Sequence, residues 1–254
     1  MIPSNYHTHT TYCHGADTPE ELVLKAIELG CPAIGLTSHS FTDFDDSYCM
    51  TLEGTQAYIS EVRALQEKYK DQIKIYLGIE QDFYSDESTA PYDYAIGSVH
   101  YVKKDGVYLS VDESKENQIR FVAKHYGGDW YAFAEDYFET VAKVYEKTGC
   151  QIIAHFDLLT KFNEDGSLFD TNHPRYRAAA DRAMEQLLKT PAALEVNFGA
   201  IARGYTTKPY PETRYLEKWI AAGKPVCYSS DCHNRNQLLD YYSDYEALMK
   251  TCTK

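Results

Sequence analysis

The chain has 254 residues, of which 44% are hydrophobic and 25% are charged, and its formal net charge is −13. These proportions are typical of a soluble globular protein, and the length allows one large core. The acidic balance argues against nucleic acid or an anionic membrane as a partner, because both require a basic surface. A small anionic substrate stays possible, since its binding depends on the local charge of a site.

The seven cysteines are odd in number and form no CxxC pair. Most lie beside apolar residues, so we expect reduced thiols that pack in the core, Cys13 and Cys232 among them. The sequence contains no apolar run near 18 residues, and its N-terminus lacks the basic and apolar regions of a signal peptide. We therefore expect a soluble, cytoplasmic protein.

Seven short apolar or β-branched runs alternate with helical patterns along the chain. The runs are Ile2–Tyr6, Ala33–Thr37, Ile73–Ile79, Tyr94–Val99, Gln151–Ala154, Ala193–Val196 and Pro225–Tyr228. The first helical pattern begins at Thr18-Pro19 and ends at Gly30. The others cover Thr55–Tyr69, Ser114–His125, Trp130–Thr148, His173–Lys189, Glu212–Ala222 and Leu238–Lys250. This alternation predicts an α/β protein with parallel strands buried on both faces.

One irregular excursion interrupts the alternation between Tyr101 and Gly128. Lys103-Lys104-Asp105-Gly106 is a turn signal between two short apolar pairs, which predicts a small hairpin. Such an excursion after a strand is a place for a lid, and a loop without function is the alternative. No linker or repeat divides the chain, so we expect a single domain over residues 1–254.

Candidate metal ligands follow the ends of these runs. His7 and His9 follow the first run, and if the strand continues through them they share one face about 6.5–7 Å apart. The others are His39, Glu80, His100, His155, Asp231 and His233. In a βα barrel the carboxyl ends of all strands meet on one face. Any single histidine here could be an ordinary core residue, but a carboxylate at Glu80, after an apolar run, is costly to bury without a cation.

The same residues carry a resemblance to a known family. The segments are His7-Thr8-His9-Thr10, Thr37-Ser38-His39-Ser40, Leu77-Gly78-Ile79-Glu80, Gly97-Ser98-Val99-His100, Ala154-His155-Phe156-Asp157 and Ser229-Ser230-Asp231-Cys232-His233. In this order they resemble the motif series of the polymerase and histidinol phosphatase (PHP) superfamily. The closest likeness within it is to the monofunctional histidinol-phosphatases. The series reaches from the N-terminus to His233.

The resemblance implies a distorted (β/α)7 barrel with a cluster of up to three divalent metals, Zn, Mn or Fe, at the carboxyl ends of the strands. By carry-over, His7, His9, Glu80 and Asp231 hold the first metal. Glu80 bridges to the second, which His100 and His155 complete. His39 and His233 hold the third, together with His14 or, as the alternative, Asp17.

The resemblance also implies residues that bind the substrate phosphate. Asn197 and Arg203 lie in a segment like the one after strand six of the family, where an arginine contacts phosphate. Lys161 stands where related phosphatases have arginine, so its charge is kept and the planar fork is lost. A guanidinium binds phosphate through two parallel hydrogen bonds, which a lysine cannot reproduce. A solvated surface cation is the alternative for both basic residues.

The expected activity is hydrolysis of L-histidinol phosphate in histidine biosynthesis, through attack of a metal-bridging hydroxide on phosphorus. The catalytic residues we expect are Asp231, His233 and Arg203, and Asp231, His233 or a water on the third metal would protonate the leaving group. Another phosphate ester, such as phosphotyrosine, a sugar phosphate or a nucleotide, is the alternative substrate. A catalytically silent metal-binding scaffold is disfavoured, because no ligand position of the series is lost. The oligomeric state is not predicted.

Overall fold

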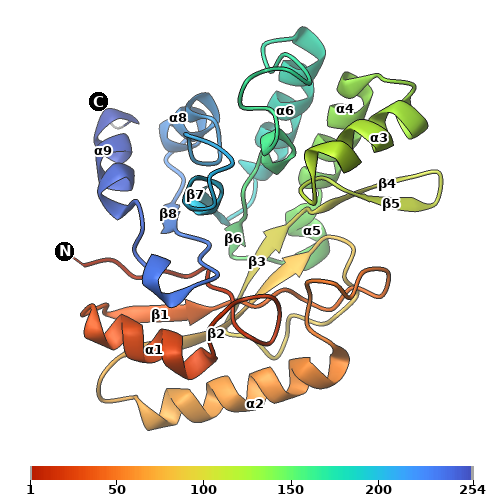
Figure 1. Cartoon of the computed structure of the whole chain (residues 1–254). Helices are drawn as coiled ribbons and strands as arrows, with labels where there is room; N and C mark the ends of the chain where they lie inside the picture. Colours follow the sequence, from red (N-terminus) through yellow and green to blue (C-terminus); the bar gives the residue numbers. More distant parts are fainter. Residues whose placement is uncertain (1, 253–254) are drawn as a thin grey trace.

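A curled sheet of six parallel strands forms the centre of the molecule, in the order β1-β2-β3-β6-β7-β8 (Figure 1). The structure, a computed structural model, describes residues 2–252. The strands are β1 (Ala33–Leu36), β2 (Lys74–Asp82), β3 (Tyr94–Ser98), β6 (Ile152–Ile153), β7 (Ala193–Asn197) and β8 (Val226–Ser229). The predicted α/β class with a parallel sheet is thus confirmed, and the last six predicted runs are strands.

The first predicted run does not form a strand within the described residues. It makes isolated parallel bridges, from Asn5 to Ile34 and from Thr8 to Cys232. The N-terminal segment thus lies between the two edges of the sheet, where the seventh strand of a closed barrel would lie. Pro3 has no N–H to give to a ladder, and the Thr8 hydroxyl donates to the carbonyl of Gly35 over 2.8 Å. A curled half-barrel of six strands is what these contacts establish.

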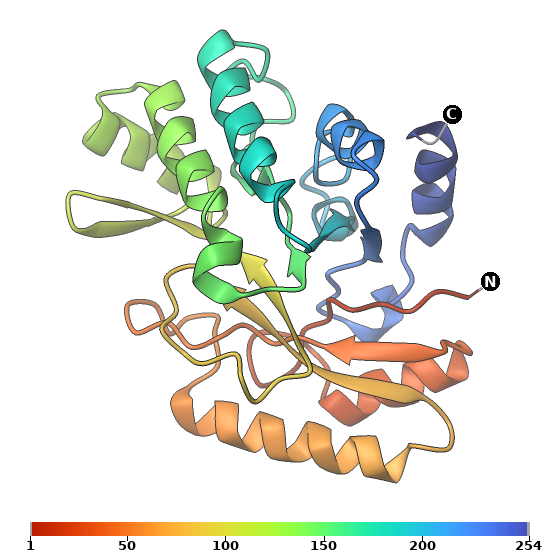
Figure 2. The same ribbon diagram turned by 180° about the vertical axis from the view of Figure 1, so that it is seen from behind.

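Helices surround the outside of the curled sheet (Figure 1). Those long enough to pack as layers are α1 (Pro19–Glu28), α2 (Leu52–Lys68), α3 (Lys115–Tyr126), α4 (Trp130–Val141), α6 (Pro174–Leu187), α8 (Thr213–Ala221) and α9 (Tyr242–Cys252). The short ones are α5 (Val144–Thr148), α7 (Gly199–Ala202) and the 3₁₀ turns η1 (Leu158–Thr160) and η2 (Arg235–Gln237). Seen from behind, α1 and α2 lie along β1 and β2, while the later helices fan out along the other strands (Figure 2).

Local signals set most helix starts. Thr18 caps α1 in a capping box with Glu21, and Pro19 occupies the first turn, as the sequence predicts. Two helix boundaries differ from the prediction. The single helix expected over Trp130–Thr148 is interrupted at Ala142 and Lys143, which lie between the end of α4 and the start of α5. The last helix begins only at Tyr242, because Tyr241 has a left-handed φ of 60°.

The predicted hairpin is present as β4 (Tyr101–Lys104) paired antiparallel with β5 (Val107–Ser110). Asp105 and Gly106 form its turn with φ of 52° and 78°, the left-handed conformations that a tight hairpin requires. Because β4 begins one residue after His100, the hairpin starts at the edge of the candidate site. It projects outward beside α3 and α4 (Figure 1).

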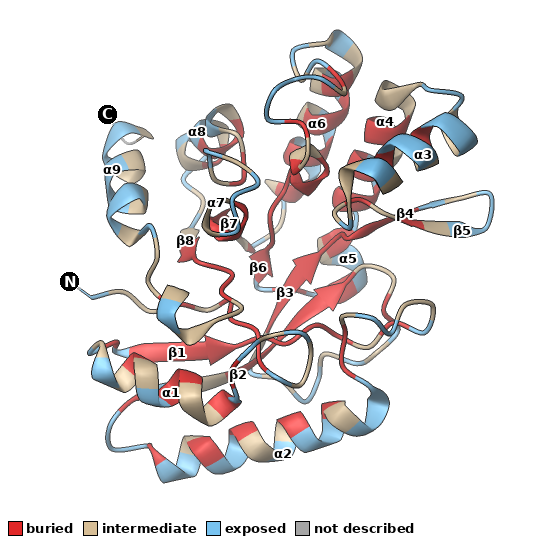
Figure 3. Ribbon diagram, in the orientation of Figure 1, coloured by how far each residue is buried: buried red, intermediate tan, exposed pale blue. Residues whose placement is uncertain are grey.

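The core lies between the strands and the inner faces of the helices, where residues of every strand are buried (Figure 3). Tyr58 of α2 shows how the layers are joined: its hydroxyl donates to the carbonyls of Leu36 and Gly78 over 2.6 and 3.0 Å. These contacts tie the end of β1 to the middle of β2. No helix in the described part of the chain is both long and apolar enough to cross a membrane.

Candidate active site

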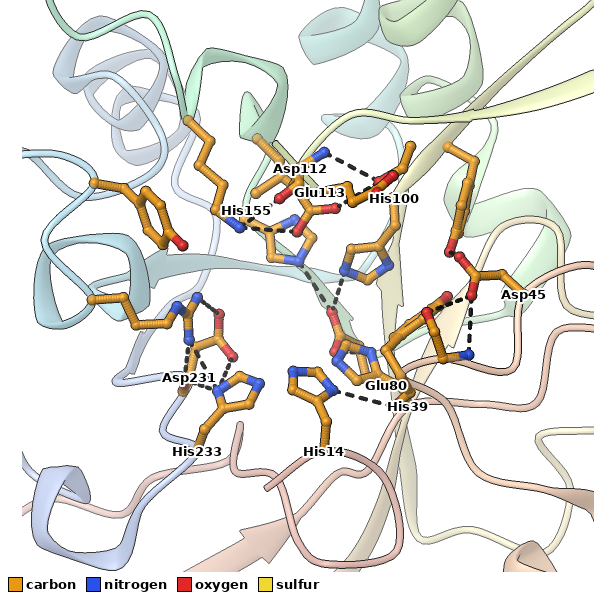
Figure 4. A pocket seen from close by; sticks show the side chains of 18 residues that line it. His14, His39, Asp45, Glu80, His100, Asp112, Glu113, His155, Asp231 and His233 are labelled. Carbon is orange, nitrogen blue, oxygen red and sulfur yellow. Dashed lines mark hydrogen bonds and ion pairs between the residues drawn. The ribbon is translucent and has the colours of Figure 1, made fainter. Parts of the chain in front are cut away.

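The predicted ligands gather at the carboxyl ends of the strands, around a cavity of about 410 Å³ (Figure 4). Glu80 of β2 lies at the floor of the cavity, and only 1% of its surface is exposed. The cavity is lined by His14, His39, Glu80, His100, His155, Lys161, Arg203, Asp231 and His233, together with residues of the hairpin and of the loop after β1. Residues separated by more than two hundred positions in the sequence therefore meet here.

The two carboxylate oxygens of Glu80 face different groups of histidines. Oε1 lies 3.0 Å from Nε2 of His155 and 3.3 Å from Nε2 of His100. Oε2 faces Nδ1 of His39 at 2.8 Å, Nε2 of His7 at 3.2 Å and Nε2 of His9 at 3.5 Å. Glu80 thus lies between two sets of nitrogen donors, as a bridging ligand must.

Asp231 closes the cluster on the opposite side from Glu80. Its Oδ1 lies 3.0 Å from Nε2 of His9 and 3.7 Å from Nε2 of His7. Its Oδ2 accepts hydrogen bonds of 3.2 Å from both Asn197 and Arg203. The backbone at Asp231 has a left-handed φ of 46°, which turns the side chain back toward the strand ends.

His14 and Asp17 have different surroundings. The His14 ring lies 5.0 Å from that of His39 and 4.3 Å from that of His233, and its Nδ1 donates to the Tyr48 carbonyl over 3.1 Å. Asp17 instead accepts the backbone N–H of Arg235 over 2.6 Å and faces the Arg235 guanidinium at 3.4 Å. Only His14 therefore lies with the other two histidines of the predicted third site.

The donor set fits divalent metal ions. Three groups have donor atoms that all lie within 4.8 Å of one another: His9, His39 and His233; His7, His9 and Glu80; and His39, Glu80 and His100. Within residues 2–252, Nε2 of His7 and Oε2 of Glu80 are buried without a hydrogen-bond partner. Such atoms are costly to bury unless a cation is shared between them. Imidazole and carboxylate together suit Zn, Mn and Fe.

Electrostatics favours neutral imidazoles at the outer part of the cluster. Burial lowers the pKa of His39 to about 4 and that of His233 to about 3, so both rings keep a free lone pair at neutral pH. His7 differs: burial lowers its pKa, but the carboxylates of Glu195, Glu80 and Asp231 together raise it well above the ordinary value. The three carboxylates around the His7 ring therefore stabilise positive charge on it.

Sequence reasoning missed the groups that support the ligands. Glu195 contacts Nδ1 of His7 at 2.5 Å, and Asp82 contacts Nδ1 of His100 at 3.1 Å. The signal for Glu195 was present, because a carboxylate inside the apolar run of β7 is as costly to bury as Glu80. Cys13, predicted only as a core packing residue, also contacts a ligand: its Sγ lies 3.6 Å from Nδ1 of His9. All seven cysteines, each within the described residues, are free thiols.

The three predicted phosphate-binding residues occupy different places. Arg203, at the end of α7, lines the cavity and keeps 31% of its side chain exposed. Lys161 lines it too, and its Nζ donates to the backbone oxygen of Asp112 over 2.8 Å and lies 3.2 Å from its carboxylate. Asn197 is buried, does not line the cavity and donates to Glu195 over 3.0 Å as well as to Asp231.

The far wall of the cavity is acidic and comes from the hairpin and the loop after β1. Asp45 accepts the hydroxyl hydrogen bonds of Tyr101 and Ser47, each 2.6 Å long. Asp112 pairs with Lys161, and although burial raises a carboxyl pKa, Lys161 and His100 lower that of Asp112 to about 2. Glu113 is exposed at the rim, and its carboxylate has no hydrogen-bond or ion-pair partner among residues 2–252. The cavity thus combines the metal-ligand cluster and two paired cations, Lys161 and Arg203, with the carboxylates of this wall.

Known proteins share this architecture and sequence. A Bacillus subtilis histidinol-phosphatase is 27% identical over 97% of this chain and 98% of its own length. The crystal structure of a Listeria monocytogenes protein assigned as a histidinol phosphatase superposes with a TM-score of 0.81, at 22% identity over 95% of this chain and 99% of that one. The histidinol phosphate phosphatase of Lactococcus lactis, solved with Zn, L-histidinol and phosphate, superposes with a TM-score of 0.69 at 18% identity, over 98% and 93% of the two chains.

The sequence model of the PHP domain matches residues 5–198. That range begins just before His7 and ends just after β7, so it contains five of the six motif segments, from His7 to His155, and the polar residues of β7. The match covers well over half of the 254 residues. The chain therefore belongs to the PHP domain family.

Proposed function

We propose that this chain is a metal-dependent phosphomonoesterase that hydrolyses L-histidinol phosphate to L-histidinol and phosphate. The observation that carries the proposal is the convergence of seven histidines, Glu80 and Asp231 around one cavity that is also lined by Arg203, Lys161 and the carboxylates of Asp45, Asp112 and Glu113. The relatives named above support the choice of substrate, since the Bacillus subtilis protein spans nearly the whole chain and bears this activity in its name.

The ligands we assign are those that the family resemblance implies. His7, His9, Glu80 and Asp231 would hold one divalent ion, Glu80 with His100 and His155 a second, and His14, His39 and His233 a third. By donor-atom distance alone, His9 rather than His14 groups with His39 and His233. Ions of this kind, Zn, Mn or Fe, neutralise charge on a phosphoryl group and activate water near neutral pH.

The chain's own residues would bind and orient the phosphate. Arg203 and Lys161 both line the cavity, so either cation would be within reach of a phosphate bound there. A guanidinium there stabilises charge on the equatorial oxygens as the ester bond breaks. Asn197 would act indirectly, because its amide holds Asp231 and Glu195 in place. The departing alkoxide needs a proton, which solvent would supply, because Asp231 is ionised at neutral pH and burial lowers the pKa of His233 to about 3.

The acidic wall matches the other half of this substrate. Histidinol phosphate carries an ammonium group and an imidazole close to its phosphate, and a cation is recognised by ionised carboxylates placed a few ångström away. Glu113, with no partner in the described chain, and Asp45, held by Tyr101, would provide that recognition. A simple sugar phosphate lacks such a cation and would leave these carboxylates unpaired.

Phosphate release from a panel of esters tests the proposal. The purified, metal-loaded protein should hydrolyse histidinol phosphate with a much higher kcat/KM than phosphotyrosine, a sugar phosphate or a nucleotide. A higher value for one of the other esters would overturn the substrate assignment. Absence of bound metal in the active protein would overturn the mechanism. We also propose that residues 1–254 form one domain that works in the cytoplasm, where its thiols stay reduced.

A further inference from the structure

Glu195 is a fully buried carboxylate in the middle of β7, with 0% of its surface exposed. A lone carboxylate at this depth is strongly disfavoured unless every lone pair has a partner. Burial raises a carboxyl pKa, yet contact with His7 makes the pKa of Glu195 lower than its ordinary value. Both oxygens of Glu195 face nitrogen donors, from His7, the backbone of His155 and the amide of Asn197, so the group acts as an acceptor of hydrogen bonds.

One oxygen of Glu195 determines which nitrogen of His7 can bind a metal. Oε1 lies 2.5 Å from Nδ1 of His7, and an acceptor-only partner requires a hydrogen on that nitrogen. The lone pair of the neutral ring is then left on Nε2, which faces Glu80 at 3.2 Å and Asp231 at 3.7 Å. A carboxylate behind a ligand histidine fixes its tautomer and raises its basicity.

The other oxygen of Glu195 holds a second ligand residue. Oε2 accepts the backbone N–H of His155 over 3.0 Å and the side-chain amide of Asn197 over 3.0 Å. His155 faces Oε1 of Glu80, whereas His7 faces Oε2 of Glu80. One buried carboxylate thus connects ligand residues that belong to the two sides of the bridging glutamate.

We propose that Glu195 is a positioning residue, which selects the metal-binding tautomer of His7 and keeps His155 aligned with it across Glu80. This inference rests on the metal site of the proposed function. It goes beyond that function because Glu195 reaches neither the metal position nor the cavity, which its side chain does not line.

The contacts of Glu195 make its amide variant a sharp test. A glutamine has one acceptor oxygen, whereas three donors now share two carboxylate oxygens. If the Glu195→Gln oxygen serves His155 and Asn197, its NH₂ must face His7, whose Nδ1 then has to accept. The hydrogen of the neutral ring moves to Nε2, and the ligand nitrogen is blocked. The reverse orientation places the NH₂ against two other donors.

The experiment uses Zn-loaded protein with ¹⁵N-labelled histidine, followed by NMR and by chelator competition. The parent should show a strongly downfield, slowly exchanging N–H resonance from Nδ1 of His7, as a short contact to a carboxylate requires. Glu195→Gln should lose this resonance and bind Zn about 10- to 100-fold more weakly. Glu195→Asp, which keeps the charge on a shorter side chain, should recover part of the affinity.

Asp157→Asn is the matched control, because Asp157 is another buried carboxylate that accepts a backbone N–H, from Glu212 over 2.8 Å. It should keep the His7 resonance and the parent's Zn affinity. An unchanged resonance and a Zn affinity within twofold of the parent in Glu195→Gln would overturn the inference. If that variant does not fold, Nδ1 of His7 without hydrogen in the Zn-loaded parent overturns it equally. A parent that binds Zn but spares histidinol phosphate would refute the proposed substrate alone.

Discussion

Arg203 holds Asp231 through both its side chain and its backbone. Nη2 of the guanidinium lies 3.2 Å from Oδ2 of Asp231, and Nη1 lies 3.1 Å from its carbonyl oxygen. Burial by itself raises a carboxyl pKa, but Arg203 and His7 lower the pKa of Asp231 well below its ordinary value. Asp231 is therefore ionised at neutral pH, with Oδ1 directed toward His9.

Replacing Arg203 should weaken catalysis without removing metal. A charge-assisted contact with a phosphate is worth roughly 2–4 kcal/mol, so Arg203→Ala should lower kcat/KM about 30- to 1000-fold for every phosphomonoester. Arg203→Lys should recover only part, because a point charge lacks the planar fork. Metal content should persist, since Asn197 and His9 still hold Asp231.

Arg175→Ala serves as the control for this prediction. Arg175 is a partly exposed arginine that pairs with Asp129 and Glu135 outside the cavity, at 2.8 Å in each case. Its kcat/KM should remain close to that of the parent. A loss in Arg203→Ala confined to histidinol phosphate would mean that Arg203 recognises the histidinol part instead.

Glu80→Gln should remove bound metal and reduce turnover to background. Five imidazoles surround Glu80. In the proposed site its ionised carboxylate would bridge two cations, and an amide cannot do so. Elemental analysis and phosphate release would measure both effects, and circular dichroism would verify the fold. Glu61→Gln is the control. Glu61 lies on α2, is partly buried and accepts a hydrogen bond from Tyr12, and its variant should retain both metal and activity. Full metal content in Glu80→Gln would contradict the ligand assignment.

His14→Ala should lower metal content and rate more than Asp17→Asn does. His14 lies among His39 and His233, whereas Asp17 is engaged by Arg235. The Asp17 variant should mainly cost stability, by about 1 kcal/mol or less, because the Arg235 pair is partly exposed. Metal analysis and urea unfolding of both variants decide the matter. The opposite order of metal loss would assign the third site to Asp17.

Glu113→Gln should impair substrates that carry a cation near the phosphate. Loss of one charge-assisted contact costs roughly 1–2 kcal/mol, which lowers kcat/KM for histidinol phosphate about 5- to 30-fold. Hydrolysis of p-nitrophenyl phosphate, which has no cation, should change little. The exposed Glu116 of α3 offers a control, since Glu116→Gln should affect neither substrate. Equal losses for both substrates would remove Glu113 from substrate recognition.

Much of this site could be predicted from the order of the residues in the sequence. Apolar runs predicted the six strands, and His39, Glu80 and His100 were each expected directly after or at the end of one of them. Parallel strands bring their carboxyl ends to one edge, so position along each run was enough to place these side chains together. The turn at Asp105-Gly106 and the cap at Thr18 were predictable for the same kind of reason, because both depend on local backbone chemistry.

Contacts between distant side chains were decided by the tertiary structure alone. Nothing local indicates that Glu195 meets His7, 188 positions away, or that Arg203 folds back on Asp231 instead of extending to solvent. The choice between His14 and Asp17 likewise depends on where Arg235 lies. Sequence spacing determines which face of a helix or strand a residue occupies. The partner that a side chain meets on that face is determined by packing across the whole chain. Burial makes an unpaired charge energetically costly, so buried charged groups are found with partners.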